Sequence, residues 1–266
     1  MIFATDLDRT IIFSSGFLEK CEEETICIEK YKENLVSHMT IKSINALENL
    51  KKKENLYIIP VTTRSTEQYL RVSTVQDCVY AITSNGGVIL YKKEIFKPWK
   101  NHIDIILDKY KNEFPKILEL MNSYSHFFKK EARIVDDMFL FAKLIYNEKD
   151  MKFFVSEISK KIDNSKWRFT LQGQKFYIIP REITKENALL FLKNYLNENK
   201  MVVSGDGKLD YGFLKIGDVA IIPDNSEVLN YIDRDFKYKS IPAGLSGTPE
   251  LFRIVREELE KENKDA

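Results

Sequence analysis

The chain has 266 residues, of which 44% are hydrophobic and 30% charged, and its formal net charge is +1. This balance is typical of a globular protein with a sizeable core. It excludes the basic surface that nucleic acids or anionic membranes require, so we expect neither as a partner.

Cysteine usage and hydropathy indicate where the protein works. The three cysteines, Cys21, Cys27 and Cys78, have no zinc-type spacing and cannot all pair, so we expect reduced thiols. The sequence shows neither a secretory leader nor an apolar stretch long enough to cross a bilayer. We therefore expect a cytoplasmic protein, either a monomer or a small homo-oligomer.

The first third of the chain alternates between predicted strands and helices. The clearest helix covers 41–53, where apolar residues recur at helical spacing. The turn sequence Ser84-Asn85-Gly86-Gly87 closes the last strand of this third. In chain order the predicted elements are strand 2–5, helix 41–53, strand 56–61, helix 66–72 and strand 79–83.

The middle of the chain, 88–179, has a different rhythm. Two short runs, 88–90 and 94–96, indicate a hairpin, and a predicted helix over 103–121 contains Pro115, which splits or kinks it. The remaining predicted elements are strand 139–146, helix 152–162 and strands 167–171 and 175–179. Strands around helices predict an α+β insert with an antiparallel sheet.

The last third returns to the first rhythm. Thr184 is a suitable cap for a helix over 185–199, and Thr248-Pro249-Glu250 starts a C-terminal helix. Strands are predicted over 201–204, 219–222 and 238–242. The alternation predicts an α/β protein with a Rossmann-like parallel-sheet core, formed by 1–87 and 180–266 and interrupted by the insert 88–179.

Two carboxylates follow the first strand, in the sequence Asp6-Leu7-Asp8-Arg9-Thr10. Side chains two residues apart on a strand point to the same face, so these charges are held close together. Each disfavours ionisation of the other. A cation or a reaction must compensate for this repulsion.

Polar residues at the carboxyl ends of the other core strands are candidates for the same site, because open parallel sheets bind ligands there. Carboxylates suit Mg²⁺, hydroxyl and backbone N–H groups suit phosphate oxygens, and a lysine adds positive charge. Together they describe phosphoryl transfer, in which a nucleophilic aspartate forms an aspartyl-phosphate. The candidates are Asp6, Asp8, Thr10, Thr62, Thr63, Arg64, Asn85, Lys185, Asp206 and Asp210.

Four of these groups, in this order, resemble the motifs of the haloacid dehalogenase superfamily. They are Asp6-x-Asp8-x-Thr10, Thr62, Lys185 and Gly205-Asp206-x-x-x-Asp210. The layout is similar to the Cof-type and sucrose-phosphatase-like branch, which carries an α+β cap between the second and third motifs. The resemblance implies that 1–87 and 180–266 form the catalytic core and that 88–179 is the cap.

The resemblance also implies a role for each carboxylate and for the lysine. Asp6 is the nucleophile, and Asp8 is first the general acid and then the general base. The backbone carbonyl of Asp8 joins the side chains of Asp6 and Asp206 around Mg²⁺, and Asp210 binds the metal directly or through its outer shell. Lys185 neutralises charge on the phosphoryl group and keeps Asp6 ionised.

Phosphate binding falls to residues on the strand-end loops. The resemblance implies that Thr62 and the N–H of Thr63 hold the phosphoryl group, and the full expected set is Thr10, Thr62, Thr63, Arg64, Asn85 and Lys185. Two positions depart from the branch. Leu209 stands where Asn is usual, so that a polar contact is lost or supplied by Lys208 or Asn225, and Thr63 replaces the Gly of Thr-Gly-Arg, which alters how Arg64 is aimed.

The sequence thus predicts a Mg²⁺-dependent phosphatase for a small phosphorylated metabolite, with a sugar phosphate as the family-level expectation. Two alternatives stay open. One is a phosphomutase, which passes the phosphoryl group to another hydroxyl. The other is a catalytically weak regulatory protein that binds a phosphometabolite, an idea that Leu209 favours. Taken singly, Lys185 could be a solvated first-turn lysine and Arg64 the partner of a surface acid.

Overall fold

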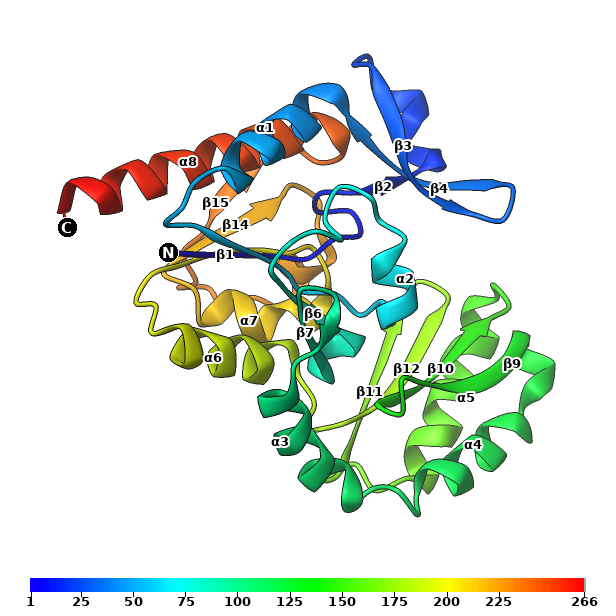
Figure 1. The fold of residues 1–266 in the computed structure, drawn as a ribbon. Helices are drawn as coiled ribbons and strands as arrows, with labels where there is room; N and C mark the ends of the chain where they lie inside the picture. Colours follow the sequence, from blue (N-terminus) through cyan, green and yellow to red (C-terminus); the bar gives the residue numbers. More distant parts are fainter. Residues whose placement is uncertain (266) are drawn as a thin grey trace. The chain divides into compact units, whose positions relative to one another are not determined.

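A computed structural model describes residues 1–265 of the chain (Figure 1). The chain divides into two compact units. The first consists of Met1–Phe96 and the chain from Lys185 onward, and the second is Lys97–Thr184. Among the described residues, no helix is both long and apolar enough to cross a membrane.

The first unit is built on a parallel sheet of five strands in the order β15-β14-β13-β1-β5. In chain order these are β1 (Ile2–Thr5), β5 (Tyr57–Pro60), β13 (Met201–Ser204), β14 (Val219–Pro223) and β15 (Lys239–Ile241). Strand β1 lies between β13 and β5, and its last residue, Thr5, is in register with Pro60 of β5 and Ser204 of β13. The loops that follow these three strands therefore start side by side.

Helices cover both faces of this sheet, as the alternating pattern predicted. In Figure 1, α1 and α8 lie on one side of the sheet and α6 and α7 on the other. Phe252 of α8 packs edge-on against Phe3 of β1, with ring centroids 6.3 Å apart. The helices of this unit are α1 (Ile41–Lys51), α2 (Thr66–Leu70), α6 (Lys185–Leu196), α7 (Tyr211–Lys215) and α8 (Thr248–Asp265).

Two smaller antiparallel sheets belong to the same unit. One contains β6 (Tyr80–Thr83), β7 (Val88–Tyr91) and β8 (Glu94–Ile95), and it joins β5 through a bridge between Val61 and Ile82. Because β7 pairs with β6, residues 88–96 belong to the first unit. The chain therefore passes from one unit to the other at 96/97 and 184/185, whereas the sequence pattern predicted boundaries at 87/88 and 179/180.

The other small sheet was not predicted. It joins β2 (Phe13–Ser14), β3 (Thr25–Tyr31) and β4 (Asn34–Thr40), in the order β2-β4-β3. Strand β4 runs directly into α1, where the Thr40 hydroxyl accepts a hydrogen bond from the Ser43 N–H as an N-cap. We call β3 and β4 the β3–β4 hairpin.

The second unit has the α+β composition that the sequence predicted. Its antiparallel sheet, in the order β11-β12-β10-β9, contains β9 (Phe128–Val135), β10 (Phe139–Leu144), β11 (Trp167–Gln172) and β12 (Lys175–Pro180). Its helices are α3 (Lys97–Asp108), α4 (Phe114–Asn122) and α5 (Glu148–Lys161). Pro115 lies in the first turn of α4, where a proline fits, so the predicted helix over 103–121 is divided between α3 and α4.

Short 3-10 helices complete both units. They cover Ser15–Lys20, Ser84–Gly86, Ser125–Phe127, Lys208–Asp210, Glu227–Asn230 and Leu245–Gly247.

Candidate active site

The ends of β1, β5 and β13 bring the predicted site residues of the first unit together. The N–H of Asp6 donates to the carbonyl of Ser204, and the N–H of Val61 donates to the carbonyl of Thr5, both at 2.8 Å. Asp6 therefore continues the sheet for one residue between the two neighbouring strands. Its carboxylate emerges where the loop after β13 begins.

Three buried carboxylates meet at this point. Asp6, Asp206 and Asp210 each offer an oxygen that lies within 4.8 Å of those of the other two. Burial, together with the charge of Asp210, raises the pKa of Asp6 to about 7. Burial, together with the charge of Asp6, raises the pKa of Asp206 to about 9. Both carboxyl groups therefore favour the protonated form unless a further cation is close by.

Lys185, the first residue of α6, is the cation of this cluster. Its side chain is 1% exposed, and its Nζ donates to Oδ1 of Asp6 at 2.6 Å and to Oδ1 of Asp210 at 2.5 Å. Burial acts to lower the pKa of Lys185, but the charges of Asp210 and Asp6 outweigh it and raise that pKa above its ordinary value. Lys185 is therefore a buried, charged member of the site and not a solvated first-turn lysine.

Asp210 also shapes the loop after β13. Its Oδ2 accepts hydrogen bonds from the N–H groups of Asp206 at 3.1 Å and Gly207 at 2.7 Å. A Cβ on Gly205 would lie 2.6 Å from the Cβ of Asp210, so only glycine fits there without movement. One carboxylate thus fixes both the lysine and the backbone that presents Asp206.

The second carboxylate of the first motif has a different environment. The side chain of Asp8 is 42% exposed, and it is held by the guanidinium of Arg64. Nε donates to Oδ2 and Nη2 donates to Oδ1, both at 2.8 Å, which is the bidentate geometry of strong arginine–carboxylate pairs. The two aspartates are therefore an unequal pair, one buried beside the lysine and one more exposed beside the arginine.

The other edge of the Arg64 side chain faces the β3–β4 hairpin. Nη1 donates to Oε2 of Glu29 at 2.8 Å, and Nη2 donates to the Ser37 hydroxyl at 3.2 Å. Arg64 was predicted to bind phosphate, but two carboxylates and a hydroxyl engage its guanidinium. Glu29 and Ser37 were missed, because the hairpin that carries them was not predicted.

The predicted phosphate-binding residues lie on two loops that are tied together. The hydroxyl of Thr62 is buried and accepts from the N–H of Arg64 at 3.1 Å. The carbonyl of Thr62 accepts from the N–H of Asn85 at 3.0 Å, and that of Arg64 from the N–H of Ser84 at 2.8 Å. Ser84 and Asn85 have positive φ values of 52° and 58°, which sets the sharp turn after β6.

Two further threonines of the predicted set also lie in these loops. Thr10 is buried, and its Oγ1 has no hydrogen-bond partner among the described residues. Thr63 follows Thr62 and is half-buried. A ligand oxygen would satisfy the hydroxyl of Thr10, since buried hydroxyl groups are normally paired.

The departure at position 209 is a packing residue. Leu209 is buried, at 5% exposure, in the 3-10 helix Lys208–Asp210. The Nζ of Lys208 lies over the ring of Tyr231, 4.8 Å from its centroid, and Asn225 is exposed. The hydrophobic side chain at this position therefore belongs to the buried core.

The oxygens of the cluster suit a hard divalent cation. Mg²⁺ prefers carboxylate oxygens and keeps several ligand positions for water and substrate phosphate. The cluster of Asp6, Asp206 and Asp210 offers such oxygens at close range, and a bound cation would offset the burial and mutual repulsion that raise the pKa values of Asp6 and Asp206. The residues present therefore fit Mg²⁺.

Comparison with known families gives a match over most of the chain. The family model described as sucrose-6F-phosphate phosphohydrolase matches residues 1–237. Among curated proteins, none matches the chain.

Solved structures match over nearly the whole chain. The sucrose-phosphatase of Synechocystis sp. PCC6803, in complex with sucrose and phosphate, has 15% sequence identity and a TM-score of 0.64, covering 95% of this chain and 96% of that one. A trehalose-6-phosphate phosphatase related protein has 14% identity and a TM-score of 0.60, covering 98% and 100%. A haloacid dehalogenase-like hydrolase from B. subtilis has 13% identity and a TM-score of 0.58, covering 95% and 98%.

These likenesses confirm the predicted fold, a parallel-sheet core with an inserted α+β unit. The family match, which spans all four motifs, confirms the resemblance on which the sequence analysis relied. The chain therefore belongs to the sucrose-6F-phosphate phosphohydrolase family, within the haloacid dehalogenase superfamily, and is a phosphoric monoester hydrolase.

Proposed function

We propose that the protein is a Mg²⁺-dependent sugar-phosphate phosphatase that works through an aspartyl-phosphate on Asp6. The observation that supports this most strongly is the contact of the Asp6 carboxylate with the ammonium of Lys185, at 2.6 Å inside a buried cluster of aspartates. Lys185 favours the ionised form of Asp6, and an ionised carboxylate in a site shielded from water is a nucleophile suited to attack on phosphorus.

Asp6, Asp206 and Asp210 would hold the metal, with the backbone carbonyl of Asp8. When bound, Mg²⁺ supplies positive charge for the transferred phosphoryl group. Lys185 adds charge from the protein side and orients Oδ1 of Asp6, which leaves the other oxygen of that carboxylate for attack. Asp210 holds both the lysine and the loop of Asp206 in place.

The reaction has two halves in which Asp8 reverses its role. In the first, the Asp6 carboxylate attacks phosphorus, the bond from phosphorus to the ester oxygen breaks, and Asp8 gives its proton to that oxygen. In the second, Asp8 takes a proton from water as the water oxygen attacks phosphorus, which releases phosphate and restores Asp6. The exposed position of Asp8 suits proton exchange with substrate and water.

The strand-end loops would bind the phosphoryl oxygens. Thr62, the N–H of Thr63, the hydroxyl of Thr10 and Asn85 remain the proposed contacts, together with Lys185. Arg64 is reassigned, because its donors already serve Asp8, Glu29 and Ser37. We place its role beside the acid–base residue and not at the phosphate.

The unit Lys97–Thr184 is proposed as the cap that selects the substrate. A sugar phosphate is supported by the description of the matching family and by the sucrose and phosphate in the Synechocystis structure. We place the protein in the cytoplasm, which agrees with three cysteines that are all free thiols.

A phosphate-release assay tests the proposal. Purified wild-type protein and Asp6→Asn are incubated with a panel of sugar phosphates, in Mg²⁺ and in EDTA. Released phosphate with wild type in Mg²⁺ alone supports the proposal. An isomerised sugar phosphate instead of free phosphate would identify a mutase. Binding of a phosphorylated sugar without turnover would identify a regulatory protein.

A further inference from the structure

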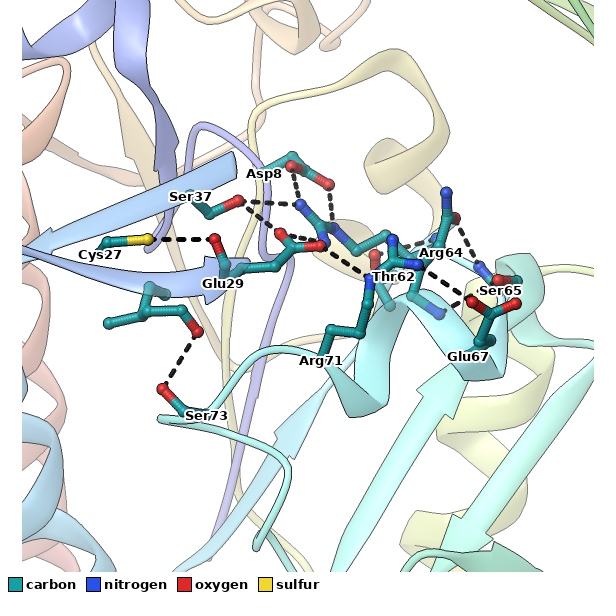
Figure 2. A network of polar contacts seen from close by, with 12 residues as sticks. Asp8, Cys27, Glu29, Ser37, Thr62, Arg64, Ser65, Glu67, Arg71 and Ser73 are labelled. Atoms are coloured by element: carbon teal, nitrogen blue, oxygen red, sulfur yellow. Dashed lines mark hydrogen bonds and ion pairs between the residues drawn. The ribbon is translucent and has the colours of Figure 1, made fainter. Parts of the chain in front are cut away.

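Arg64 connects the acid–base residue to the β3–β4 hairpin. Figure 2 shows its guanidinium between the carboxylates of Asp8 and Glu29, with the hydroxyl of Ser37 beside it. One edge of the planar group, formed by Nε and Nη2, serves Asp8, and Nη1 serves Glu29. The donors of a guanidinium are fixed in one plane. The position of Glu29 therefore sets the orientation of the donors that bind Asp8.

The β3–β4 hairpin places the Glu29 side chain next to Arg64. Glu29 lies opposite Ser37, and the register of β3 shifts on both sides of Glu29, as in a β-bulge. Such a bulge breaks the alternation of the strand and redirects a side chain. As a result Ile28 and Glu29 are both buried although they are neighbours, and the Glu29 side chain is 0% exposed.

Both carboxylate oxygens of Glu29 have partners. Oε2 accepts from Arg64 and from the Ser37 hydroxyl at 2.7 Å, and Oε1 accepts from Nε of Arg71 at 3.4 Å. Arg71 also lies over the ring of Tyr31 in β3, 4.5 Å from its centroid, and contacts Glu67 at 3.2 Å. Glu29 is thus fixed from the hairpin side as well as from the site side.

We propose that Glu29 is a positioning residue for the reaction, and that it acts through Arg64 to hold the Asp8 carboxylate where it exchanges a proton with the leaving oxygen. This inference rests on the proposed function. Asp8 is more exposed than Arg64 and Glu29, so without a rigid partner its side chain would sample several rotamers. A carboxylate keeps lone pairs beyond the two that Arg64 uses, so Asp8 can be held and still carry the proton.

Glu29 has a second possible role, which is only to balance the buried charge of Arg64 and so hold the fold together. The two roles differ in the reaction step that they affect. Loss of positioning harms the proton transfer to the leaving oxygen, and an alkoxide needs that proton whereas a nitrophenolate does not. A purely structural residue would affect esters with good and poor leaving groups alike.

The experiment compares Glu29→Gln with wild type on two esters, in Mg²⁺. One is para-nitrophenyl phosphate, and the other is the best sugar phosphate from the phosphate-release panel. The value of kcat/KM reports the steps up to cleavage of the ester. Acid catalysis contributes about 10² to 10⁴-fold, so we expect E29Q to lose about 10-fold or more on the sugar phosphate and less than about 3-fold on the aryl ester.

Two further variants sharpen the result. Arg64→Lys keeps a cation beside Glu29 but loses the pair of donors that binds both oxygens of Asp8. Its kcat/KM should fall on the sugar phosphate and much less on the aryl ester. Glu67→Gln is the matched control, because it removes an exposed partner of Arg71 in the same network without touching Arg64. Its kcat/KM should stay within about 2-fold of wild type on both esters.

Equal losses on both esters, or no loss in a folded E29Q protein, would overturn the inference. If E29Q does not fold, R64K decides by the same comparison, and failure of both to fold would show a structural network and also overturn it. The proposed function fails separately, if wild type and Asp6→Asn release phosphate at the same rate.

Discussion

The ammonium of Lys185 lies 2.6 Å from Oδ1 of Asp6, although 179 residues separate the two in the sequence. This contact joins the start of α6 to the end of β1. It explains why a lysine occupies a helix start, where the helix dipole disfavours positive charge. The carboxylates of Asp6 and Asp210 stabilise it there.

Replacing Lys185 with methionine should destabilise the protein and abolish turnover. Methionine fills a similar volume, but it leaves Asp6 and Asp210 buried without their cation. Removing one partner of a buried ion pair costs about 3–5 kcal/mol. Urea denaturation at constant pH, with and without Mg²⁺, measures this loss.

Lys42→Met is the control for that measurement. Lys42 is in the same unit, at the start of α1, and its side chain is 69% exposed beside Glu23. We expect its free energy of unfolding to stay within about 0.5 kcal/mol of wild type. Similar losses in the two variants would show that the buried cluster has no special energetic role.

The stability of the metal-free protein should fall as pH rises. The pKa of Asp6 is raised to about 7 and that of Asp206 to about 9, each from 3.8. Between 3.8 and those values the folded state holds protons that the unfolded state has lost, so these groups favour folding at low pH and lose that effect as pH increases. Thermal unfolding in EDTA between about pH 5.5 and 8.5 tests this, since carboxylate pairs elsewhere lose stability only at lower pH.

Addition of Mg²⁺ should reverse the trend. The metal binds the ionised carboxylates, so it should raise the melting temperature more at the upper end of this range than at the lower end. Asp6→Asn removes one of the two carboxyl groups and should flatten the pH dependence in EDTA. A melting temperature that rises with pH in EDTA would contradict the assignment of the raised pKa values to this cluster.

Gly205→Ala should damage the loop after β13. The added methyl group would lie 2.6 Å from the Cβ of Asp210 and 2.8 Å from its Cγ, so Asp210 must move away from the N–H groups of Asp206 and Gly207. Overpacking of this kind costs about 1–3 kcal/mol. We expect a lower free energy of unfolding and weaker Mg²⁺ stabilisation.

Gly16→Ala is the matched control, because a Cβ at Gly16 would meet nothing within 4 Å. Its stability should remain within about 1 kcal/mol of wild type. If G205A retained the full Mg²⁺-induced rise in melting temperature, the geometry of Asp210 would not matter for the metal.

The core of the fold was predictable because its signals are local. Strands β1, β5 and β13 are short apolar runs, each followed by a polar loop, and the parallel register then brings their ends together. The meeting of Asp6, Lys185, Asp206 and Asp210 follows from that topology. The strands alone did not predict the roles of these residues, which came from the likeness of their spacing to known motifs.

The β3–β4 hairpin was not predictable in the same way. Glu29 is buried beside Ile28, so the two-residue period that marks a half-buried strand is broken by the bulge. A charged residue in such a segment is predicted to be exposed. The burial of Glu29 depends on its ion pair with Arg64, which is 35 residues away in the sequence. The partners of Arg64 could therefore not be assigned from the sequence.

The predicted boundary at 87/88 and the division of the structure at 96/97 differ for a related reason. Residues 88–96 form a hairpin pattern, and the change of rhythm at Val88 predicts the start of the insert there. Which sheet a hairpin joins is set by pairing, and β7 pairs with β6 of the first unit. Strand pattern alone does not carry that information.

The most direct test of the account traps the covalent intermediate in Asp8→Asn. With para-nitrophenyl phosphate the leaving group needs no proton, so phosphoryl transfer to Asp6 should proceed, while hydrolysis stalls without the general base. In Mg²⁺ we expect a burst of one equivalent of nitrophenolate and a phosphoryl group on the peptide that contains Asp6, detected by mass spectrometry after acid quench. A protein without any phosphoryl adduct, or with the adduct on another peptide, would contradict the account.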